Sequence, residues 1–550
     1  MNSSMIGFRD NKSVTNCIYR IEVNLMFYRV KQTLTFFFLF FLVSNNCLSQ
    51  PSIAWQKCLG GTMGDNAFSM CETRDGNYII AGISTSDDGD VIGPNLGGFD
   101  IWVLMMDTSG NILWQKNYGG VNYDNARSII QTSDGGFIMA GATRSGNIPG
   151  RIGSSGYDFY VVRIDSIGNL LWHKCYGGTS DDEASDIKET LSGDFYVLGY
   201  TASSDSDVSV NYGSADYWLI KIDSAGTLLS EHSYGGSSYD KGQNIILDSN
   251  GAIQLVGYSS SNDVDVIGNH GGQDYWLVNV DSSENILSNY SYGGSGDDYA
   301  NSVKQEGNNL VIAGWSYSSD GDVLGHHGQS VVPDIWIIKI DSLNNLVWNR
   351  SYGSSNVDAQ PILQIDDLGN YFLFGVSDGY DGDVSHNNGG PDYWLSYLDS
   401  SGNILWERNA GGSGFDFFYY GILSSTGKII MCGNSDSPNN GDVSGYHGGV
   451  GGDIWLVAFN DIYTFVNENS LDLDIKVYPN PFNDKLLCKL NLPGVSFTVN
   501  VFDVSGRIVY SSSEMRENFE VDLAFLSSGF YEVNICNSKV NKTYKVIKQN

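Results

Sequence analysis

Hydrophobic and polar residues alternate in short runs along most of the chain, and turn residues separate the runs. The clearest set of four consecutive runs lies at residues 68–73, 78–84, 100–107 and 111–118. Asp75-Gly76-Asn77 separates the first two runs, and Gly110 lies between the last two. Gly and Asn in such turns readily adopt the positive φ that tight hairpins require. The pattern therefore predicts short antiparallel strands and no long amphipathic helix.

This four-run unit repeats with a period of about 58 residues. One marker is an Asp followed by two hydrophobic or aromatic residues, at Asp100, Asp158, Asp216, Asp274, Asp334, Asp392 and Asp453. A second marker is an Asp after a Gly-rich step, at Asp65, Asp124, Asp182, Asp240, Asp298, Asp358 and Asp416. Four strands per repeat are typical of a β-propeller blade. The sequence therefore predicts an all-β fold, a seven-bladed β-propeller with four-stranded blades over residues 51–461.

The two ends of the repeat array complement each other. The last repeat ends near residue 459 without a fourth strand, whereas Ile53-Ala54-Trp55-Gln56-Lys57 forms a single strand-like run that precedes the first repeat. We expect this N-terminal strand to close the last blade, because closure removes exposed sheet edges.

The two faces of the predicted propeller differ in their loops. Strand direction alternates within a blade, so the short hairpin turns lie on one face. The Gly-rich links between blades and loops of about 15 residues lie on the other face. Binding residues concentrate on long loops carried by a rigid scaffold, so we expect ligand binding on the loop-rich face.

The long loops carry an Asp-x-Asp step that makes them candidate calcium sites. The step occurs at Asp88 and Asp90, Asp205 and Asp207, Asp263 and Asp265, Asp320 and Asp322, and Asp381 and Asp383. Clustered carboxylates and carbonyls suit Ca²⁺, which takes six to eight oxygen ligands. The alternative is that these side chains accept hydrogen bonds within their own turns. No copy has the complete calcium loop with a distal Glu.

Departures from the repeat identify candidate ligand-binding residues. The second repeat replaces its acidic loop with one that carries Arg144 and Arg151, a pair that could bind an anionic sugar or carboxylate. The fifth repeat carries His326 and His327, and imidazole beside carboxylate could bind a metal. The alternatives are an ordinary divergent loop and solvated histidines. The Asp markers recur in every repeat, whereas a catalytic pair needs two unlike environments, so no catalytic residue is assigned.

The N-terminus and the charge balance bear on localisation and partners. Residues 1–50 are predicted to be a leader with a signal peptide whose apolar core runs from Leu34 to Val43, and Met26 is a second candidate start. This core is short for a membrane span, so we expect no transmembrane span in the mature form. Lys and Arg total 30 against 63 for Asp and Glu, a net charge of −33 that argues against nucleic acid as a partner.

The composition changes after a predicted linker at residues 462–474. Six short alternating runs follow, at residues 485–490, 497–503, 507–511, 519–523, 530–536 and 542–548. They predict an Ig-like β-sandwich over residues 475–550.

Four short motifs of this region carry a family resemblance. They are Val477-Tyr478-Pro479-Asn480-Pro481, Asp503-Val504-Ser505-Gly506-Arg507, Leu526-Ser527-Ser528-Gly529-Phe530-Tyr531 and Lys545-Val546-Ile547-Lys548. Together they resemble the type A C-terminal sorting domain of Bacteroidetes cargo of the type IX secretion system. The resemblance implies that the secretion machinery is a partner and that the protein is secreted or held at the outer-membrane surface.

The repeats have a broader resemblance. Residues 107–114, Asp-Thr-Ser-Gly-Asn-Ile-Leu-Trp, resemble repeats of quinoprotein-like and secreted β-propellers. A quinone cofactor is not expected with seven repeats and no vicinal Cys pair. The leading hypothesis is a non-catalytic binding or adhesion protein that recognises an extracellular glycan or protein, with Ca²⁺ as the candidate cofactor. The alternatives are a secreted, endoglucanase-like polysaccharide hydrolase, with its site at the irregular loops of repeats two and five, and a structural surface-layer component.

Overall fold

The computed structural model describes residues 50–153, 156–248, 252–329, 331–460, 476–489, 496–503, 507–516, 519–537 and 540–549. The predicted signal peptide and the predicted linker lie outside these described residues. The chain divides into two compact units, Met1–Tyr463 and Thr464–Asn550, and each is described by itself. Every regular element in the described ranges is a β-strand, and these ranges contain no helix long and apolar enough to cross a membrane.

The described part of the first unit forms seven four-stranded antiparallel sheets. Their first strands are β2 (Asp65–Glu72), β6 (Asp124–Gln131), β10 (Asp182–Glu189), β14 (Asp240–Leu247), β18 (Asp298–Glu306), β22 (Asp358–Ile365) and β26 (Asp416–Leu423). The second strands are β3 (Tyr78–Ser84), β7 (Phe137–Thr143), β11 (Phe195–Thr201), β15 (Ile253–Ser259), β19 (Asn309–Ser316), β23 (Tyr371–Ser377) and β27 (Ile429–Ser435). The third strands are β4 (Asp100–Met106), β8 (Asp158–Ile164), β12 (Asp216–Ile222), β16 (Asp274–Val280), β20 (Asp334–Ile340), β24 (Asp392–Leu398) and β28 (Asp453–Phe459). The fourth strands are β5 (Ile112–Tyr118), β9 (Leu170–Tyr176), β13 (Leu228–Tyr234), β17 (Ile286–Tyr292), β21 (Leu346–Tyr352), β25 (Ile404–Ala410) and β1 (Ile53–Leu59).

Both Asp markers of the repeat begin strands. One begins each first strand and the other begins each third strand. In the first sheet, β2 contains a bulge between Ala67 and Ser69, which adds one residue to the strand. The bulge interrupts the alternation of side chains, so the pattern predicts a strand start at residue 68 although β2 begins at Asp65.

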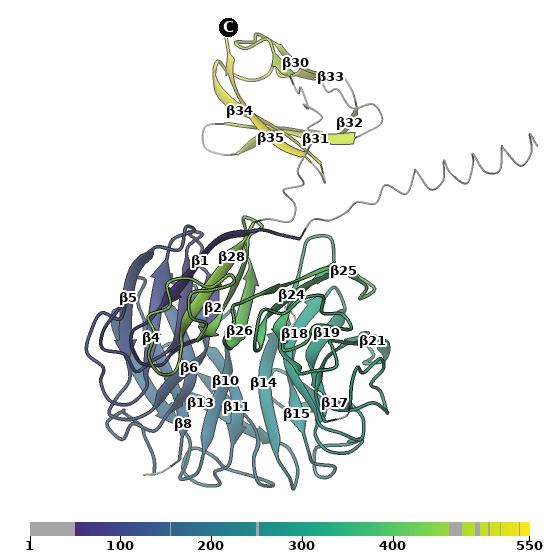
Figure 1. Cartoon of the computed structure of the whole chain (residues 1–550). Helices are drawn as coiled ribbons and strands as arrows, with labels where there is room; N and C mark the ends of the chain where they lie inside the picture. Colours follow the sequence, from purple (N-terminus) through teal and green to yellow (C-terminus); the bar gives the residue numbers. More distant parts are fainter. Residues whose placement is uncertain are drawn as a thin grey trace, which may run out of the picture. The chain divides into compact units, whose positions relative to one another are not determined.

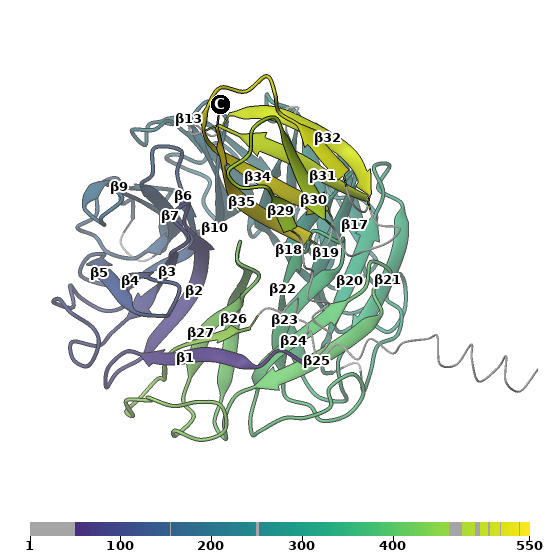
Figure 2. The same cartoon turned by 90° about the horizontal axis from the view of Figure 1, so that it is seen from above.

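The first strands contact one another in a closed cycle, from β2 through β6, β10, β14, β18, β22 and β26 back to β2. Figures 1 and 2 show the sheets arranged side by side around a common centre. The predicted N-terminal strand is confirmed, because β1 pairs antiparallel with β28 and places Trp55 opposite Ala458. The indole of Trp455 also donates a hydrogen bond to Gln56 Oε1 at 2.9 Å. Repeated four-stranded sheets in this arrangement fit a β-propeller.

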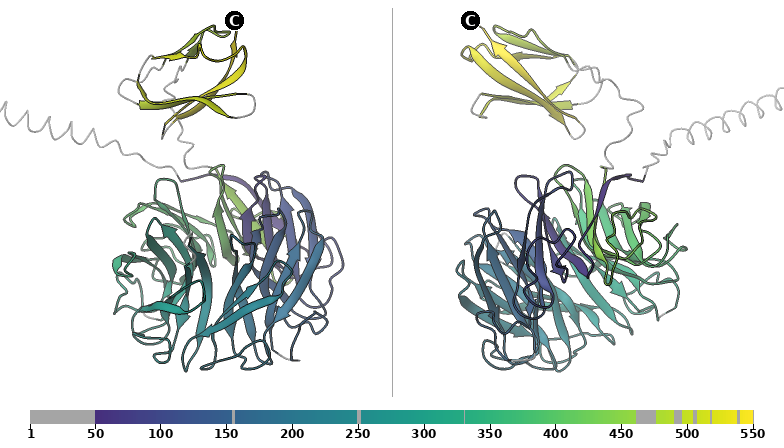
Figure 3. Two further views of the ribbon diagram at one scale, coloured as in Figure 1. Left: turned by 180° about the vertical axis from the view of Figure 1, so that it is seen from behind. Right: turned by 60° about the vertical axis from the view of Figure 1, so that its left-hand side comes forward.

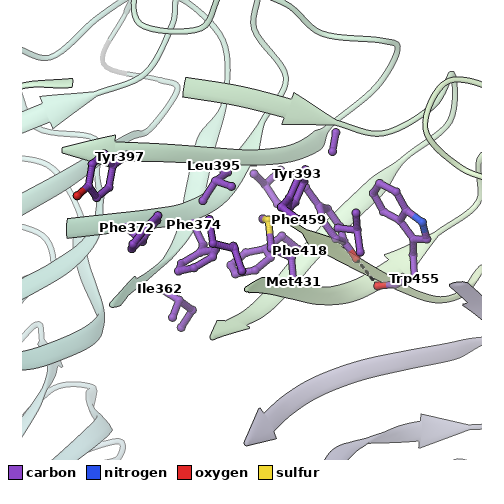
Figure 4. Close-up of a cluster of buried hydrophobic side chains, with 14 of the residues drawn as sticks. Ile362, Phe372, Phe374, Tyr393, Leu395, Tyr397, Phe418, Met431, Trp455 and Phe459 are labelled. Atoms are coloured by element: carbon purple, nitrogen blue, oxygen red, sulfur yellow. Dashed lines mark hydrogen bonds between the residues drawn. The ribbon is translucent and has the colours of Figure 1, made fainter. Parts of the chain in front are cut away.

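Aromatic side chains pack the sheets against each other. Figure 4 shows the cluster that involves the last two sheets, with Phe374, Tyr393 and Phe418 near its centre and Trp455 at one end. Tyr393 and Trp455 have ring centroids 4.6 Å apart, and the phenol donates a hydrogen bond to the Trp455 carbonyl at 3.0 Å. Each fully buried aromatic side chain contributes about 1.5–3 kcal/mol by leaving water. The aromatic residues that follow the marker Asp in the third strands therefore hold neighbouring sheets together.

The second unit consists of two antiparallel sheets, seen in yellow and light green in Figure 3. One contains β29 (Lys476–Tyr478), β30 (Lys485–Lys489) and β33 (Phe519–Asp522). The other contains β31 (Ser496–Phe502), β32 (Ile508–Arg516), β34 (Gly529–Asn537) and β35 (Val540–Lys548). Leu486 and Val521 of the first sheet and Val499 and Val533 of the second belong to one buried core. Each of the six predicted runs overlaps a strand.

Candidate functional site

The Asp that begins each first strand organises the link between sheets. Asp124 is fully buried and accepts hydrogen bonds on Oδ2 from the Gly120 N–H at 2.6 Å and the Ser145 hydroxyl at 2.8 Å. Its Oδ1 accepts a hydrogen bond from the Thr143 hydroxyl. These contacts fix the Gly-rich link, which agrees with the structural role that the repetition of this Asp indicates.

The first Asp of each Asp-x-Asp step also fixes a link. Asp88 accepts the Thr62 N–H at 2.8 Å on Oδ1 and the Thr62 hydroxyl at 2.9 Å on Oδ2. Equivalent backbone bonds join Asp205 to Thr179, Asp263 to Ser237, Asp320 to Ser295 and Asp381 to Ser355.

The second Asp of each step accepts a hydrogen bond on Oδ2 from the N–H of the first glycine of the same link. The contacts, at 3.2–3.4 Å, join Asp90 to Gly60, Asp207 to Gly177, Asp265 to Gly235, Asp322 to Gly293 and Asp383 to Gly353. Within the described ranges, no three His, Cys, Asp or Glu side chains gather so that they could hold a metal ion. The contacts favour the turn-stabilising interpretation, and calcium at these ten residues stays a prediction.

The candidate ligand-binding residues lie at two separate places. In the second sheet the Arg151 guanidinium pairs with Asp158 at 2.6 Å, and its side chain is only 3% exposed. The exposed Arg144 lies over the Tyr157 ring, with 3.9 Å from its guanidinium carbon to the ring centroid.

In the fifth sheet His326 and His327 approach one carboxylate. Their Nδ1 atoms lie 3.7 and 2.9 Å from Asp334 Oδ2, and the His326 side chain is 3% exposed. The Asp334 contacts raise the pKa of His327 despite its partial burial. Of the four candidates, Arg144 is the most open to solvent, and their role in binding stays a prediction.

A cavity that the sequence analysis does not predict lies among the first strands. It has a volume of about 610 Å³, within the range of ligand sites, and residues of all seven first strands line it. We call it the central channel. Its basic lining residues are Arg127, Lys188, Lys241 and Lys304, and its acidic ones are Glu183, Asp186 and Glu189. In the sequence these basic residues stand at different positions counted from the start of their first strands, so no repeated spacing indicates the channel.

A row of aromatic side chains lies at the loop-rich ends of three adjacent sheets and reaches the channel at Trp315. We call Tyr200, Tyr239, Tyr258, Tyr299 and Trp315 the aromatic rim. Successive ring centroids are 5.7, 6.4, 4.9 and 5.3 Å apart. All five side chains are half-buried, and Trp315 lines the channel. Tyr200, Tyr258 and Trp315 occupy the same position in three consecutive repeats, one residue before the end of the second strand. Tyr239 and Tyr299 lie on opposite sides of the marker Asp in their repeats.

The comparison with family models identifies the C-terminal region. Residues 476–549 match the secretion system C-terminal sorting domain. This match supports cargo of the type IX secretion system and interaction with its machinery. It indicates that the protein is secreted and attached at the cell surface.

Other similarities are distant. The regulatory protein FlaEY of Caulobacter vibrioides is 27% identical over 220 residues, which cover 37% of this chain and only 23% of that protein. The WD40 domain of Neurospora crassa Pan2 aligns over 72% of this chain and 88% of its own, with 11% identity and a TM-score of 0.39. A Synechocystis apocarotenoid oxygenase mutant aligns over 70% and 88%, with 11% identity and a TM-score of 0.35. Similarity at this level carries no argument about ligand or reaction.

Proposed function

We propose that the protein is a cell-surface, seven-bladed β-propeller that binds a glycan at the loop-rich mouth of its central channel. The seven four-stranded sheets and the strand contributed by β1 support the blade count. The two-sheet core of the second unit supports an Ig-like sandwich that serves export and attachment. Binding at the surface is the function that a rigid scaffold with one loop-rich face supports best.

The aromatic rim is the observation that carries this proposal. A sugar ring presents C–H groups on its faces and hydroxyls on its edges, so it packs well on an aromatic side chain beside polar groups. Tyr258, Tyr299 and Trp315 form the closest part of the rim, and Tyr299 and Trp315 are stacked with 23° between their planes. A row of half-buried rings next to a cavity suits several successive sugar units.

The carboxylates of the channel are poorly suited to hydrolysis. A glycosidase needs two carboxylates flanking the scissile bond, one of them free to protonate the leaving oxygen. Asp186 instead accepts hydrogen bonds from the Ser128 hydroxyl and the Ile245 N–H, and Glu189 accepts the Ser133 N–H. The comparisons give the hydrolase alternative no support. We therefore favour binding without hydrolysis.

The test is retention of the full secreted protein on a glycan array and on insoluble polysaccharides, with Trp315→Ala as the main variant. We expect about tenfold weaker retention, equivalent to about 1.4 kcal/mol, because one stacking surface is lost. Tyr380→Ala is the matched control, since Tyr380 is 76% exposed on another loop and lies outside the rim. Equal retention of the wild type and Trp315→Ala, or no retention on any glycan, would reject the proposal.

A further inference from the structure

The acidic and basic side chains of the central channel are not equally engaged. Of its four basic residues, only Lys188 makes an ion pair in the described part of the chain, with Asp186 at 2.6 Å. Arg127, Lys241 and Lys304 face the channel without a carboxylate within ion-pair distance. In the described part of the chain these three cationic groups make no ion pair, although the charges of Glu183 and Asp186 act on Lys241 and Lys304 from a longer distance.

The acidic residues, in contrast, already have donors. Asp186 accepts a hydroxyl, two backbone N–H groups and the Lys188 ammonium. Glu189 accepts both the N–H and the hydroxyl of Ser133, at 2.7 and 2.5 Å. Burial, together with the charge and hydrogen bonding of Glu183, raises the pKa of the Tyr200 phenol, so Glu183 is engaged with the rim. In the described ranges, Asp186 and Glu189 thus accept hydrogen bonds, whereas Arg127, Lys241 and Lys304 have no ion-pair partner.

Two of these cations, Arg127 and Lys241, lie against aromatic rings. The Arg127 guanidinium carbon is 4.3 Å from the Phe68 ring centroid, and Lys241 Nζ is 5.0 Å from that of Tyr200. Burial lowers the pKa of Lys241, and it lowers the pKa of Lys304 to about 8. Lys241 and Lys304 are half-buried. A partly desolvated ammonium without an ion-pair partner is costly, and an anion that enters the channel would reduce this cost.

The three cations also lie at different depths. Lys241 is the second residue of β14, Arg127 the fourth of β6 and Lys304 the seventh of β18. One residue of β18 is taken up by its bulge, so the first and last of these positions are four steps apart in the sheet register, about 13 Å at a rise of about 3.3 Å per residue. An extended chain with several anionic groups fits such a series better than a single small anion.

We infer that the ligand of the central channel is an anionic polysaccharide, one that bears carboxylate or sulfate groups on successive sugars. This inference rests on the proposed glycan binding at the rim. The sugar rings stack on the aromatic rim, and the anionic groups pair with Lys241, Arg127 and Lys304. The net charge of −33 does not prevent this, because charges beyond about 8–10 Å are screened at physiological salt.

The experiment compares polymers that share a backbone and differ in charge. The full secreted protein is titrated with polygalacturonate and its fully methyl-esterified form, and with dextran sulfate and dextran. We expect at least one anionic polymer to bind at least tenfold more tightly than its neutral partner, by a margin that shrinks as salt is raised. Lys241→Gln and Lys304→Gln should each weaken binding of that polymer about fivefold, and Lys241→Arg should retain it.

Lys485→Gln is the control for net charge, because Lys485 is exposed in the second unit. Circular dichroism establishes that each variant is folded. Equal binding of the charged and neutral polymers would overturn the anionic inference but leave glycan binding intact. Losses no larger in the two channel variants than in Lys485→Gln would overturn the assignment to the channel. Failure to bind any polymer here or on the array would overturn the proposed function as well.

Discussion

The strand β4 is flanked by two aspartates whose pKa values move in opposite directions. Asp100 begins the strand, is 1% exposed and accepts the Leu96 N–H on Oδ2, while its Oδ1 has no partner among the described residues. Asp107 follows the strand and accepts the N–H groups of Ser109 and Asn111 at 2.9 Å. We therefore expect Asp100→Asn and Asp107→Asn to change the pH dependence of stability in opposite directions.

Burial, reinforced by the nearby Asp124, raises the pKa of Asp100 from 3.8 to about 6. Between about pH 4 and pH 6 the folded protein holds a proton at Asp100 that the unfolded chain has lost, so stability falls as pH rises through this window. At about 1.4 kcal/mol for each pH unit, the loss is about 3 kcal/mol by pH 7. Asp100→Asn removes the ionisation. We expect little change at pH 4 and a gain of up to about 3 kcal/mol at pH 8.

Hydrogen bonds from Asn111 lower the pKa of Asp107, so its carboxylate stabilises the fold at neutral pH and loses this effect as the pH falls below 4. Asp107→Asn should therefore cost stability at pH 8 and not at acid pH. The assay is urea unfolding of the full protein and both variants at pH 4.5, 6 and 8, followed by tryptophan fluorescence. If Asp100→Asn lowers the unfolding midpoint equally at pH 4.5 and pH 8, then Asp100 acts as an ionised carboxylate and the reasoning is wrong.

Three further predictions concern ring closure, the thiols and the packing of a link. Deletion of residues 51–59 removes β1 and exposes the edge of β28, so we expect a lower melting temperature and association seen by light scattering; a stable monomer would contradict this. Burial raises the pKa of Cys58 and Cys488 to about 12, so both thiols should react with a thiol reagent at pH 8 only after denaturation, and rapid native reaction would contradict their burial. Gly119→Ala should destabilise by about 1–3 kcal/mol because its Cβ would lie 2.6 Å from Asp100 Oδ1, whereas Gly146→Ala meets no atom within 4 Å and should be neutral in the same melting assay.

The sheet architecture follows from local signals. Alternation of side chains and the hairpin turn residues predict the strands, and the single run at residues 53–57 predicts the closing strand that pairs with β28. The exception is the start of each first strand, where a bulge such as that at Ala67 and Ser69 breaks the period of two. A pattern based on strict alternation therefore places the first strand of the first sheet three residues too late.

The channel could not be predicted in the same way. Arg127, Lys241 and Lys304 occupy three different positions in three first strands, so no spacing relates them. They meet only because the first strands face a common cavity, which depends on how the sheets pack around one another. Arg151 was visible in the sequence as a departure from the repeat, but the fold pairs it with a buried Asp158 and leaves it little access to solvent.

The first and second positions of each first strand differ in how much they vary between sheets. The first position is Asp in all seven sheets and is fully buried, because its carboxylate fixes the link to the preceding sheet. The second position holds Asn66, Asn125, Glu183, Lys241, Tyr299, Ala359 and Phe417, in the same order of sheets. At this position Glu183 and Lys241 line the central channel and Tyr299 belongs to the rim. The residue at this position thus differs in size and charge from sheet to sheet, while the buried Asp beside it stays the same. Under the proposed function, ligand specificity is therefore to be sought where neighbouring repeats differ inside the channel, and not at the aspartates that every repeat shares.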